Sequence, residues 1–213
     1  LHQALDSHPE VKAPRALAGI VSVGGFTARP ADADDVLSEA FRLRFRAFAD
    51  AGHLDLSHWP GGLMRDRFDE LAMQFVARDA AGELVGTVRL ALPEAGLPVR
   101  SLFAFTPLNL PRERVGEIGR LAIDPRWRNR RAPLVAMVRA ILDHGAAQGL
   151  THFYAFVPAR AVRSYRALGY STWELPCTPP TPEMLRNRVP MAPYFATQDP
   201  RVIVFTHQPP EDA

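Results

Sequence analysis

The chain has 213 residues, of which 47% are hydrophobic and 23% charged, and its formal net charge is +2. This composition is typical of a globular protein. No apolar run approaches the roughly 20 residues of a membrane-spanning helix, and the single cysteine, Cys177, excludes an internal disulfide framework. The N-terminus lacks a basic start followed by an apolar stretch, so together with the lone cysteine it predicts a cytoplasmic protein without a membrane span.

Arginine supplies nearly all of the positive charge, because Lys12 is the only lysine among the 25 basic residues. Base composition of the genome explains the overall bias but not the placement. Arginine binds phosphates and carboxylates through a planar fork that lysine lacks. No interleaved aromatic residues or recognition-helix pattern accompany the arginines, so we expect no nucleic-acid partner. They gather at Arg126, Arg128, Arg130 and Arg131, and again at Arg160, Arg163 and Arg166.

The N-terminal part predicts a lead-in, a β-rich segment and a helix. Residues 1–16 are expected to be loose or helical, and residues 19–31 are rich in β-forming residues. Apolar residues recur at helical spacing over 31–52, where Asp32 or Asp34 is a candidate N-cap.

The middle of the chain predicts a loop and a hairpin. Residues 53–70 contain a Pro-Gly-Gly turn and are expected to form a loop. Two strands, 72–79 and 83–92, are separated by a short turn that is typical of a β-hairpin. A connection that contains SLFAF (101–105) and several prolines follows.

The C-terminal half predicts strands that alternate with helices. Pro133 suits the first turn of a helix over 134–149. The order of elements predicts one mixed-sheet domain over residues 1–213, with its core at about 19–207. The other predicted elements are strands at 114–124, 151–157, 171–175 and 201–207, a helix at 159–170 and a proline-rich segment at 176–200.

Several short motifs of this chain resemble those of known acyltransferases. The C-terminal strand, arginine-rich turn, helix, strand and helix ending in SYRALGY resemble GNAT-type N-acyltransferases. The N-terminal half is similar to acyl-homoserine-lactone synthases and especially to long-chain N-acyl amino acid synthases. The motifs occur in the family's order as LRFRAF (43–48), RDRFDE (65–70), GTVRLALP (86–93), SLFAF and EIGRLAI (117–123).

The resemblance covers about residues 35–170 and implies the fold. This fold is of the α/β (α+β) class: a GNAT-like mixed, mostly antiparallel twisted sheet with a splayed central strand pair, flanked by helices.

Two departures from the lactone synthases favour the amino acid synthases. Lactone synthases usually carry a tryptophan after the first motif, where this chain has GHLDLSH (52–58), and a glutamate where it has Met64.

Glu117 and Arg120 lie three residues apart in a predicted strand and would therefore point to opposite faces. A bulge at Gly119 would bring both to one side and free a backbone N–H for a thioester carbonyl and its oxyanion. Glu117 is then the candidate base that takes a proton from the attacking amine. The alternative is a structural ion pair at a sheet edge.

Tyr165 stands where many GNAT-type enzymes keep a tyrosine that protonates the departing thiolate. Packing of the helix against the sheet is an equally good explanation of this residue. Cys177 has no nearby histidine motif, so direct transfer without a covalent intermediate is expected.

The turn after the Glu117 strand departs from the GNAT pattern of a glycine-containing pyrophosphate loop. Arg131 and Pro133 occupy its two small-residue positions, so the cradle of amides is impaired while side-chain charge is high. We therefore expect the donor to be acyl-phosphopantetheine on an acidic acyl carrier protein, steered by arginines. The alternative is acyl-coenzyme A. The positions assigned to donor binding are Leu121, Ile123, Arg128, Arg130 and Arg131.

The remaining motif residues are assigned to substrate binding. In the resembled families Arg44, Asp66, Asp69 and Arg89 form a buried charge network beside the acyl donor; a solvated loop is the alternative for RDRFDE. No histidine or third carboxylate stands at ligand spacing, so no metal site is expected. Phe48 and Arg120 belong to the same motifs. Phe103 and Phe105 are candidates for the acyl tunnel or for ordinary core.

Together these features predict an N-acyltransferase without a tightly bound cofactor. It would move a medium or long fatty acyl group from acyl carrier protein to the amine of an amino acid or similar small molecule. The alternatives are lactone-signal synthesis, acetyl-coenzyme A-dependent transfer and a non-catalytic module that binds acyl groups or carrier protein.

Overall fold

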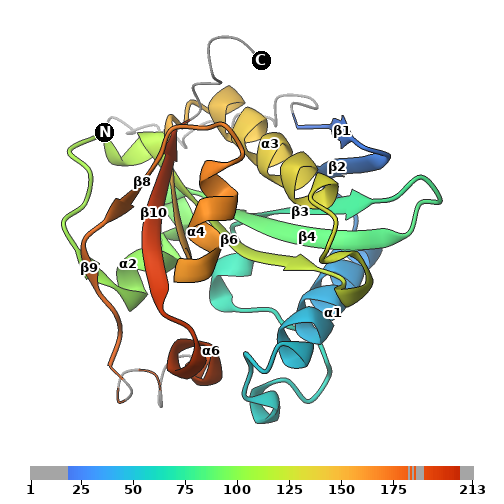
Figure 1. Cartoon of the computed structure of the whole chain (residues 1–213), viewed down its shortest axis with the longest axis horizontal. Coiled ribbons are helices and arrows are strands. Elements are labelled where there is room, and N and C mark those ends of the chain that lie inside the picture. The colour runs from blue at the N-terminus through green and yellow to red at the C-terminus, as the bar shows by residue number, and fades with distance from the viewer. Residues whose placement is uncertain (1–18, 182, 184, 186–189, 207–213) are drawn as a thin grey trace, which may run out of the picture.

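The computed structural model describes residues 19–181, 183, 185 and 190–206. An eight-stranded sheet in the order β1-β2-β3-β4-β6-β7-β10-β8 forms its centre, and β5 pairs with β9 in a separate two-stranded sheet (Figure 1). The strands of the large sheet are β1 (Val21–Val23), β2 (Phe26–Pro30), β3 (Met73–Arg78), β4 (Leu84–Ala91), β6 (Val115–Ile123), β7 (His152–Pro158), β8 (Thr172–Leu175) and β10 (Pro200–Thr206); the small sheet consists of β5 (Ala104–Phe105) and β9 (Cys177–Thr178).

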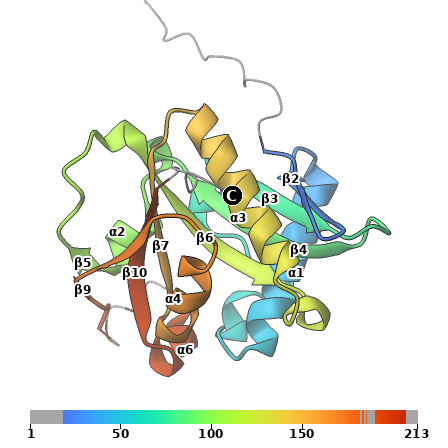
Figure 2. The ribbon, with the colours of Figure 1, turned by 45° about the horizontal axis from the view of Figure 1, so that its top comes forward.

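Helices cover both faces of the large sheet. The α-helices are α1 (Asp34–Asp50), α2 (Pro98–Leu102), α3 (Ala132–Ala147), α4 (Ala159–Arg166) and α6 (Ala192–Thr197). Helix α3 lies over β1 to β4, and α1 packs on the opposite face against β3, β4 and β6 (Figures 1 and 2). Close approach explains one glycine in β4, since a Cβ on Gly86 would lie 2.8 Å from the Cε atom of Met137 on α3.

Every described pair of neighbouring strands in the large sheet is antiparallel except β6 and β7, which are parallel. Their pairing covers only Val115 to Glu117, opposite His152 to Tyr154. Beyond this point β6 turns away from β7, as Figure 2 shows. The predicted fold class, including the splayed central pair, is confirmed.

The predicted bulge lies one residue further along β6 than expected. Gly119 is paired with Arg89, and the register shifts before Ala122 pairs with Thr87. Arg120 and Leu121 therefore share the single opposing residue Val88, which defines a β-bulge. Arg120 takes the left-handed conformation (φ 55°), whereas the strand is extended at Gly119. The prediction of a bulge at Gly119 itself is wrong.

Most predicted elements match the structure, and a few details differ. The hairpin is β3–β4, and Pro133 lies in the first turn of α3. Helix α1 is capped by neither predicted aspartate, because its N-cap residue, Ala33, has no side-chain hydrogen-bond acceptor. The lead-in 1–16 and the last residue of the predicted strand 201–207 lie outside the described residues.

No helix or strand was predicted in the proline-rich segment 176–200, but the structure has β9 and α6 there. Within the described ranges, no helix is both long enough and apolar enough to cross a membrane.

Candidate active site

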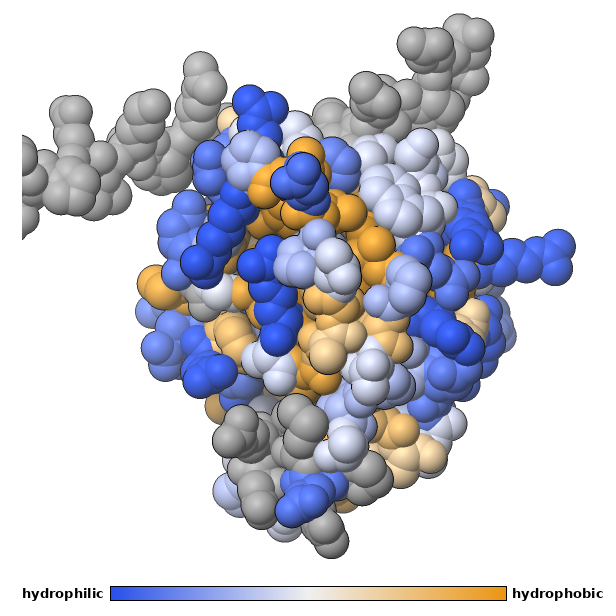
Figure 3. All heavy atoms as spheres, turned by 90° about the vertical axis from the view of Figure 1, so that its left-hand side faces the viewer, coloured by the Kyte–Doolittle hydropathy of each residue, from blue (hydrophilic) through white to orange (hydrophobic). Residues whose placement is uncertain are grey.

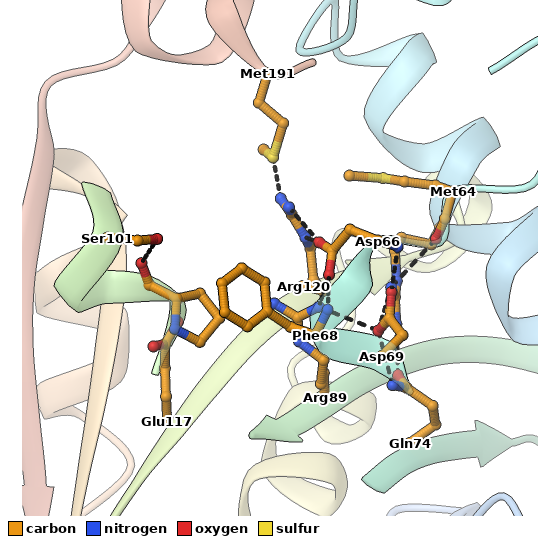
Figure 4. A network of polar contacts seen from close by, with 12 residues as sticks. Met64, Asp66, Phe68, Asp69, Gln74, Arg89, Ser101, Glu117, Arg120 and Met191 are labelled. Atoms are coloured by element: carbon orange, nitrogen blue, oxygen red, sulfur yellow. Dashed lines mark hydrogen bonds and ion pairs between the residues drawn. The ribbon is translucent and has the colours of Figure 1, made fainter. Parts of the chain in front are cut away.

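Six polar side chains from five elements meet at the bulge and form what we call the charged network. Figure 4 shows Arg120 between Met191 and Asp66, with the ring of Phe68 beside Arg89. Burial is nearly complete for Arg44 and Arg89, which are 0% and 2% exposed. The members are Arg44 of α1, Asp66 and Asp69 of the turn at η2 (Arg67–Asp69), Gln74 of β3, Arg89 of β4 and Arg120 of β6.

The two aspartates connect the three arginines. Asp69 accepts hydrogen bonds from Arg44 at 3.0 and 3.1 Å and from Arg89 at 3.1 Å. Asp66 accepts from Arg89 at 2.8 Å and from Arg120 at 2.7 and 3.2 Å. The alternative of a solvated RDRFDE loop is wrong for these carboxylates, because the arginines hold both inside the fold.

Local backbone structure fixes the aspartates in place. The Asp66 side chain accepts from the Phe68 N–H, and the Asp69 side chain accepts from the Asp66 N–H, so the two form a capping box at η2. The amide of Gln74 donates to Asp69 at 2.9 Å and accepts from Arg44 at 2.5 Å.

The charges of the network are strongly coupled. Burial lowers the pKa of Arg44 to about 10 despite the neighbouring Asp69. Burial also opposes ionisation of Asp66, but Arg120 and Arg89 outweigh it and hold its pKa well below the usual range. Asp66 and Asp69 likewise outweigh burial at Arg89 and raise its pKa. Arg44, Asp66 and Arg89 are therefore ionised at neutral pH.

Glu117 lies beside the network and is 1% exposed. One carboxylate oxygen, Oε2, accepts a 2.7 Å hydrogen bond from the N–H of Val99 in α2. The other, Oε1, is buried and has no hydrogen-bond partner among the described residues. Burial raises the pKa of Glu117 to about 7, although Val99 and Arg89 act in the opposite direction.

Gly119 leaves space in front of the unpartnered oxygen of Glu117. A Cβ at position 119 would lie 3.5 Å from Oε1 of Glu117 and 4.0 Å from Nη2 of Arg89. Such a distance is ordinary van der Waals contact, so a side chain would fit but would cover the oxygen. Gly119 thus places no side chain against this buried oxygen.

The splay between β6 and β7 opens a cavity of about 490 Å³, which we call the splay cavity. One wall is the backbone of β6 from Ile118 to Ile123, and the other is β7 from Ala155 to Pro158 with α4. Six of the predicted site residues line this cavity outside the network, namely Phe48, Gly119, Leu121, Ile123, Arg128 and Tyr165.

A second cavity of about 530 Å³, the charged cavity, lies on the network side. Arg120 and Phe156 line both cavities, so these two side chains lie at the boundary between them. Charged groups and apolar rings share the second cavity. Its lining residues are Asp66, Arg67, Phe68, Arg89, Pro98, Ser101, Leu102, Arg120, Phe156 and Pro190.

Tyr165 packs against the hydrophobic core and also lines the splay cavity. Its ring makes an edge contact with Phe205 at 5.7 Å, and burial raises its pKa to about 12. Tyr194 of α6 lines the same cavity, and its pKa is raised by burial and by the nearby Tyr165. Both phenols are protonated at neutral pH and can donate.

The turn arginines are mostly engaged within the chain. Arg128 lines the splay cavity but binds Asp50 at 2.7 Å and the carbonyl of Ala47 at 2.8 Å. Arg131 donates to the carbonyl of Ala167. Arg130 is exposed. The assignment of these arginines to donor binding stays a prediction.

Phe103 and Phe105 pack into an aromatic cluster beside the cavities. Phe103 contacts the rings of Phe156 at 5.5 Å and Phe195 at 5.9 Å, and Phe105 contacts Tyr154 at 5.3 Å. On the side of β8, β9 and α2 the surface is apolar at its centre and hydrophilic at its border (Figure 3). The core explanation of the two phenylalanines thus fits the structure, and Phe156 connects them to the cavities.

Sequence reasoning missed four residues of this region. Gln74, Phe156 and Tyr194 belong to no quoted motif, and their contacts arise from strand and helix packing. Trp59, which directly follows the segment 52–58, was also missed. It is buried in a cluster with Leu54, Met64, Met191 and Tyr194.

Across the described ranges, no group of three or more histidine, cysteine, aspartate or glutamate residues is placed to hold a metal ion. His53 lines the splay cavity, where its ring contacts Phe48 and Tyr194. Burial, with Arg160 and Arg128, lowers the pKa of His53, so it is neutral at pH 7.

Comparisons with known proteins agree with this geometry. The model of the family described as N-acyl amino acid synthase FeeM matches residues 39–180. No curated protein sequence matches the chain. Three solved structures share the fold at low sequence identity. The acyl-homoserine-lactone synthase LasI has 11% identity, a TM-score of 0.65 and coverage of 86% of this chain and 90% of its own. TofI in complex with an inhibitor and MTA has 16% identity, a TM-score of 0.61 and coverage of 86% of this chain and 91% of its own. FeeM from uncultured soil microbes has 16% identity, a TM-score of 0.54 and coverage of 87% of this chain and 92% of its own.

Proposed function

Because this chain belongs to the N-acyl amino acid synthase family and is therefore an N-acyltransferase, we propose that it acylates an amino acid or a similar small amine. The acyl group would be of medium or long chain length, and acyl carrier protein would present it as a phosphopantetheine thioester. We treat residues 1–213 as one acyltransferase domain. Direct attack of the amine on the thioester needs no bound cofactor.

One observation carries this proposal: the β6–β7 splay leaves one backbone edge of β6 unpaired along a cavity. An extended pantetheine arm can add to this edge as a strand does and receive hydrogen bonds from the backbone. Its thioester would then lie near the bulge, where a free amide can stabilise the oxyanion. Loss of one such donor costs roughly 3–4 kcal/mol of transition-state stabilisation in other enzymes.

Glu117 is the proposed base. The amine must lose a proton to attack, and a carboxyl group with a pKa of about 7 is half ionised at neutral pH. Its unpartnered oxygen, Oε1, is buried beside Gly119, which lines the splay cavity. The amine nitrogen forms a bond to the carbonyl carbon, its proton passes to Glu117 directly or through water, and the C–S bond then breaks.

Tyr165 is the proposed acid, and it would give its proton to the departing thiolate. Its raised pKa keeps the hydroxyl protonated, and its place in the splay cavity puts it on the donor side. Tyr194 is the alternative acid, since it lines the same cavity.

The acceptor is proposed to occupy the charged cavity. Asp66 can attract an amine and Arg89 a carboxylate, and both line this cavity. Exposed Arg130 and the cavity-lining Arg128 would attract the acidic carrier protein or, alternatively, coenzyme A.

Lactone-signal synthesis is a second candidate, and Trp59 favours it. Its position after the first motif restores a feature expected of lactone synthases. One related structure is described as a coenzyme A-dependent lactone synthase with SAM and isopentyl-CoA. We therefore include S-adenosylmethionine among the acceptors to be tested.

Mass spectrometry of lipid extracts from cells that overproduce the protein tests the proposal. A new N-acyl amino acid supports it and names both substrates, whereas a new acyl-homoserine lactone supports the second candidate. Acetylated amines alone, or no new product, would overturn the long-chain proposal.

A Glu117→Gln variant separates an enzyme from a carrier-binding module. The enzyme loses turnover while it still binds acyl carrier protein in a pull-down. A binding module would retain all of its activity in cells.

A further inference from the structure

A third cavity adjoins the charged cavity and opens to solvent on the side of α2. It has a volume of about 510 Å³, and we call it the outer cavity. Its lining residues are Arg67, Phe68, Gly96, Leu97, Arg100, Ser101 and Arg112. Arg67, Phe68 and Ser101 also line the charged cavity, so a small molecule can occupy the two together.

The outer cavity has a strong excess of positive charge. Three of its lining residues are arginines, and no aspartate or glutamate lines it. None of Arg67, Arg100 and Arg112 forms an ion pair with a carboxylate in the part of the chain that the structure describes. Unlike the network arginines, these three are available to a ligand.

Two of the three arginines are held in position. The Arg67 guanidinium lies over the ring of Phe68, with its carbon 4.8 Å from the ring centroid. Arg112 donates to the carbonyl of Pro93 at 3.2 Å. Neither contact neutralises charge, and both reduce the conformational entropy that binding an anion would cost.

In the charged network, in contrast, each of the three arginines is paired with an aspartate. The three arginines face Asp66 and Asp69, and Glu117 supplies the third negative charge when it is ionised. A zwitterionic amino acid also has no net charge, so it leaves the outer cavity's excess unmatched.

We propose that the acceptor amine carries a second anionic group, a carboxylate or a phosphate, that binds Arg67, Arg100 and Arg112. The acceptor class is thus an acidic amino acid or a phosphorylated amine, and the inference rests on the proposed function. The outer cavity does not suit the donor, because it shares no lining residue with the splay cavity.

Isothermal titration of the purified full chain tests the inference with two matched pairs of probes. These are L-glutamate against L-glutamine, and O-phospho-L-serine against L-serine. The anionic member of at least one pair is expected to bind about tenfold more tightly, the factor that one additional charge-assisted contact supplies. The pair that discriminates tells carboxylate from phosphate.

A double variant, Arg100→Gln with Arg112→Gln, is expected to reduce that ratio to about twofold or less. Both side chains are exposed, so the fold should persist, and thermal unfolding checks this. The matched control is Arg42→Gln, an exposed arginine of α1 outside the three cavities, which should keep the wild-type ratio.

Equal binding within both pairs overturns the inference, as does an unchanged ratio in the double variant. Acyl-transfer assays with the same probes then separate the two proposals. Anion-selective binding without acyl transfer to any amine rejects the proposed function and leaves the outer-cavity site standing. Equal transfer to the anionic and neutral members rejects the outer-cavity inference alone.

Discussion

The protein concentrates arginine in two regions that behave differently. In the charged network, Arg44, Arg89 and Arg120 are buried or nearly so and each binds an aspartate. In the turn after β6, Arg128 and Arg130 are exposed, and the aspartate that Arg128 binds, Asp50, is exposed as well. Arginine therefore forms part of the buried structure in the network and of the accessible surface in the turn.

Desolvation explains the difference. A buried ion pair leaves an uncompensated charge when one partner is removed, which typically costs about 3–5 kcal/mol. An exposed pair is replaced by water and contributes about 0–1 kcal/mol. Substitutions in the two regions should differ accordingly.

The largest effect is expected for Asp69→Asn, which removes the carboxylate that binds Arg44 and Arg89. The free energy of unfolding should fall by about 3–5 kcal/mol in urea denaturation. The matched control, Asp50→Asn, removes the exposed partner of Arg128 and should change stability by less than about 1 kcal/mol. Equal effects of the two substitutions would remove the basis of the comparison.

Glu117→Gln is expected to lower kcat by a factor of about 10²–10⁴, the usual contribution of a general base. In the wild type, kcat/KM should rise with pH up to about 7, because only ionised Glu117 accepts the proton. The variant's residual activity should lack this acidic limb. A limb of the same shape in the variant would assign it to another group.

The raised pKa of Glu117 also has a consequence for stability. Because the folded-state pKa of about 7 exceeds the reference value of 4.5, the wild type should lose stability as pH rises from 4.5 to 7. The loss is about 3 kcal/mol relative to Glu117→Gln, whose side chain stays neutral. Urea denaturation of both proteins at pH 4.5 and pH 8 measures the difference, and parallel pH profiles would contradict it.

A smaller effect is expected at Arg120, where the backbone rather than the charge is tested. Arg120→Gly and Arg120→Ala both lose the contacts to Asp66, but only glycine adopts φ 55° without strain. The glycine variant should therefore be the more stable of the two by about 1 kcal/mol in thermal unfolding. An alanine variant of equal stability would show that the bulge relaxes.

The smallest effect is expected in the turn. Arg130→Ala should raise the KM for acyl carrier protein by about two- to fivefold at low salt, without any change in stability. The KM for acyl-coenzyme A should change less if the carrier protein is the donor. A larger change with coenzyme A would reverse the assignment of the donor.

Strand alternation and helical spacing, which are local signals, predicted the hairpin and the main helices. The family resemblance of the motifs implied the type of sheet and five of the six members of the charged network. The exact place of the bulge was not predictable, since it depends on Arg120 reaching Asp66, 54 positions earlier in the chain. Tyr194 and Gln74 escaped notice because their roles come only from long-range packing.

The short pairing between β6 and β7 also has a consequence for the dynamics of the large sheet. Strands β1, β2, β3, β4 and β6 form one part of the large sheet, and β7, β10 and β8 form the other. The short parallel ladder from Val115 to Glu117 joins the two parts. A pantetheine arm that binds between the two parts would form hydrogen bonds with the backbone along the splay and so connect them. Binding of the donor should therefore slow amide hydrogen exchange in Ile118–Ile123 and Ala155–Val157, far more than in β3 and β4, which are paired on both sides.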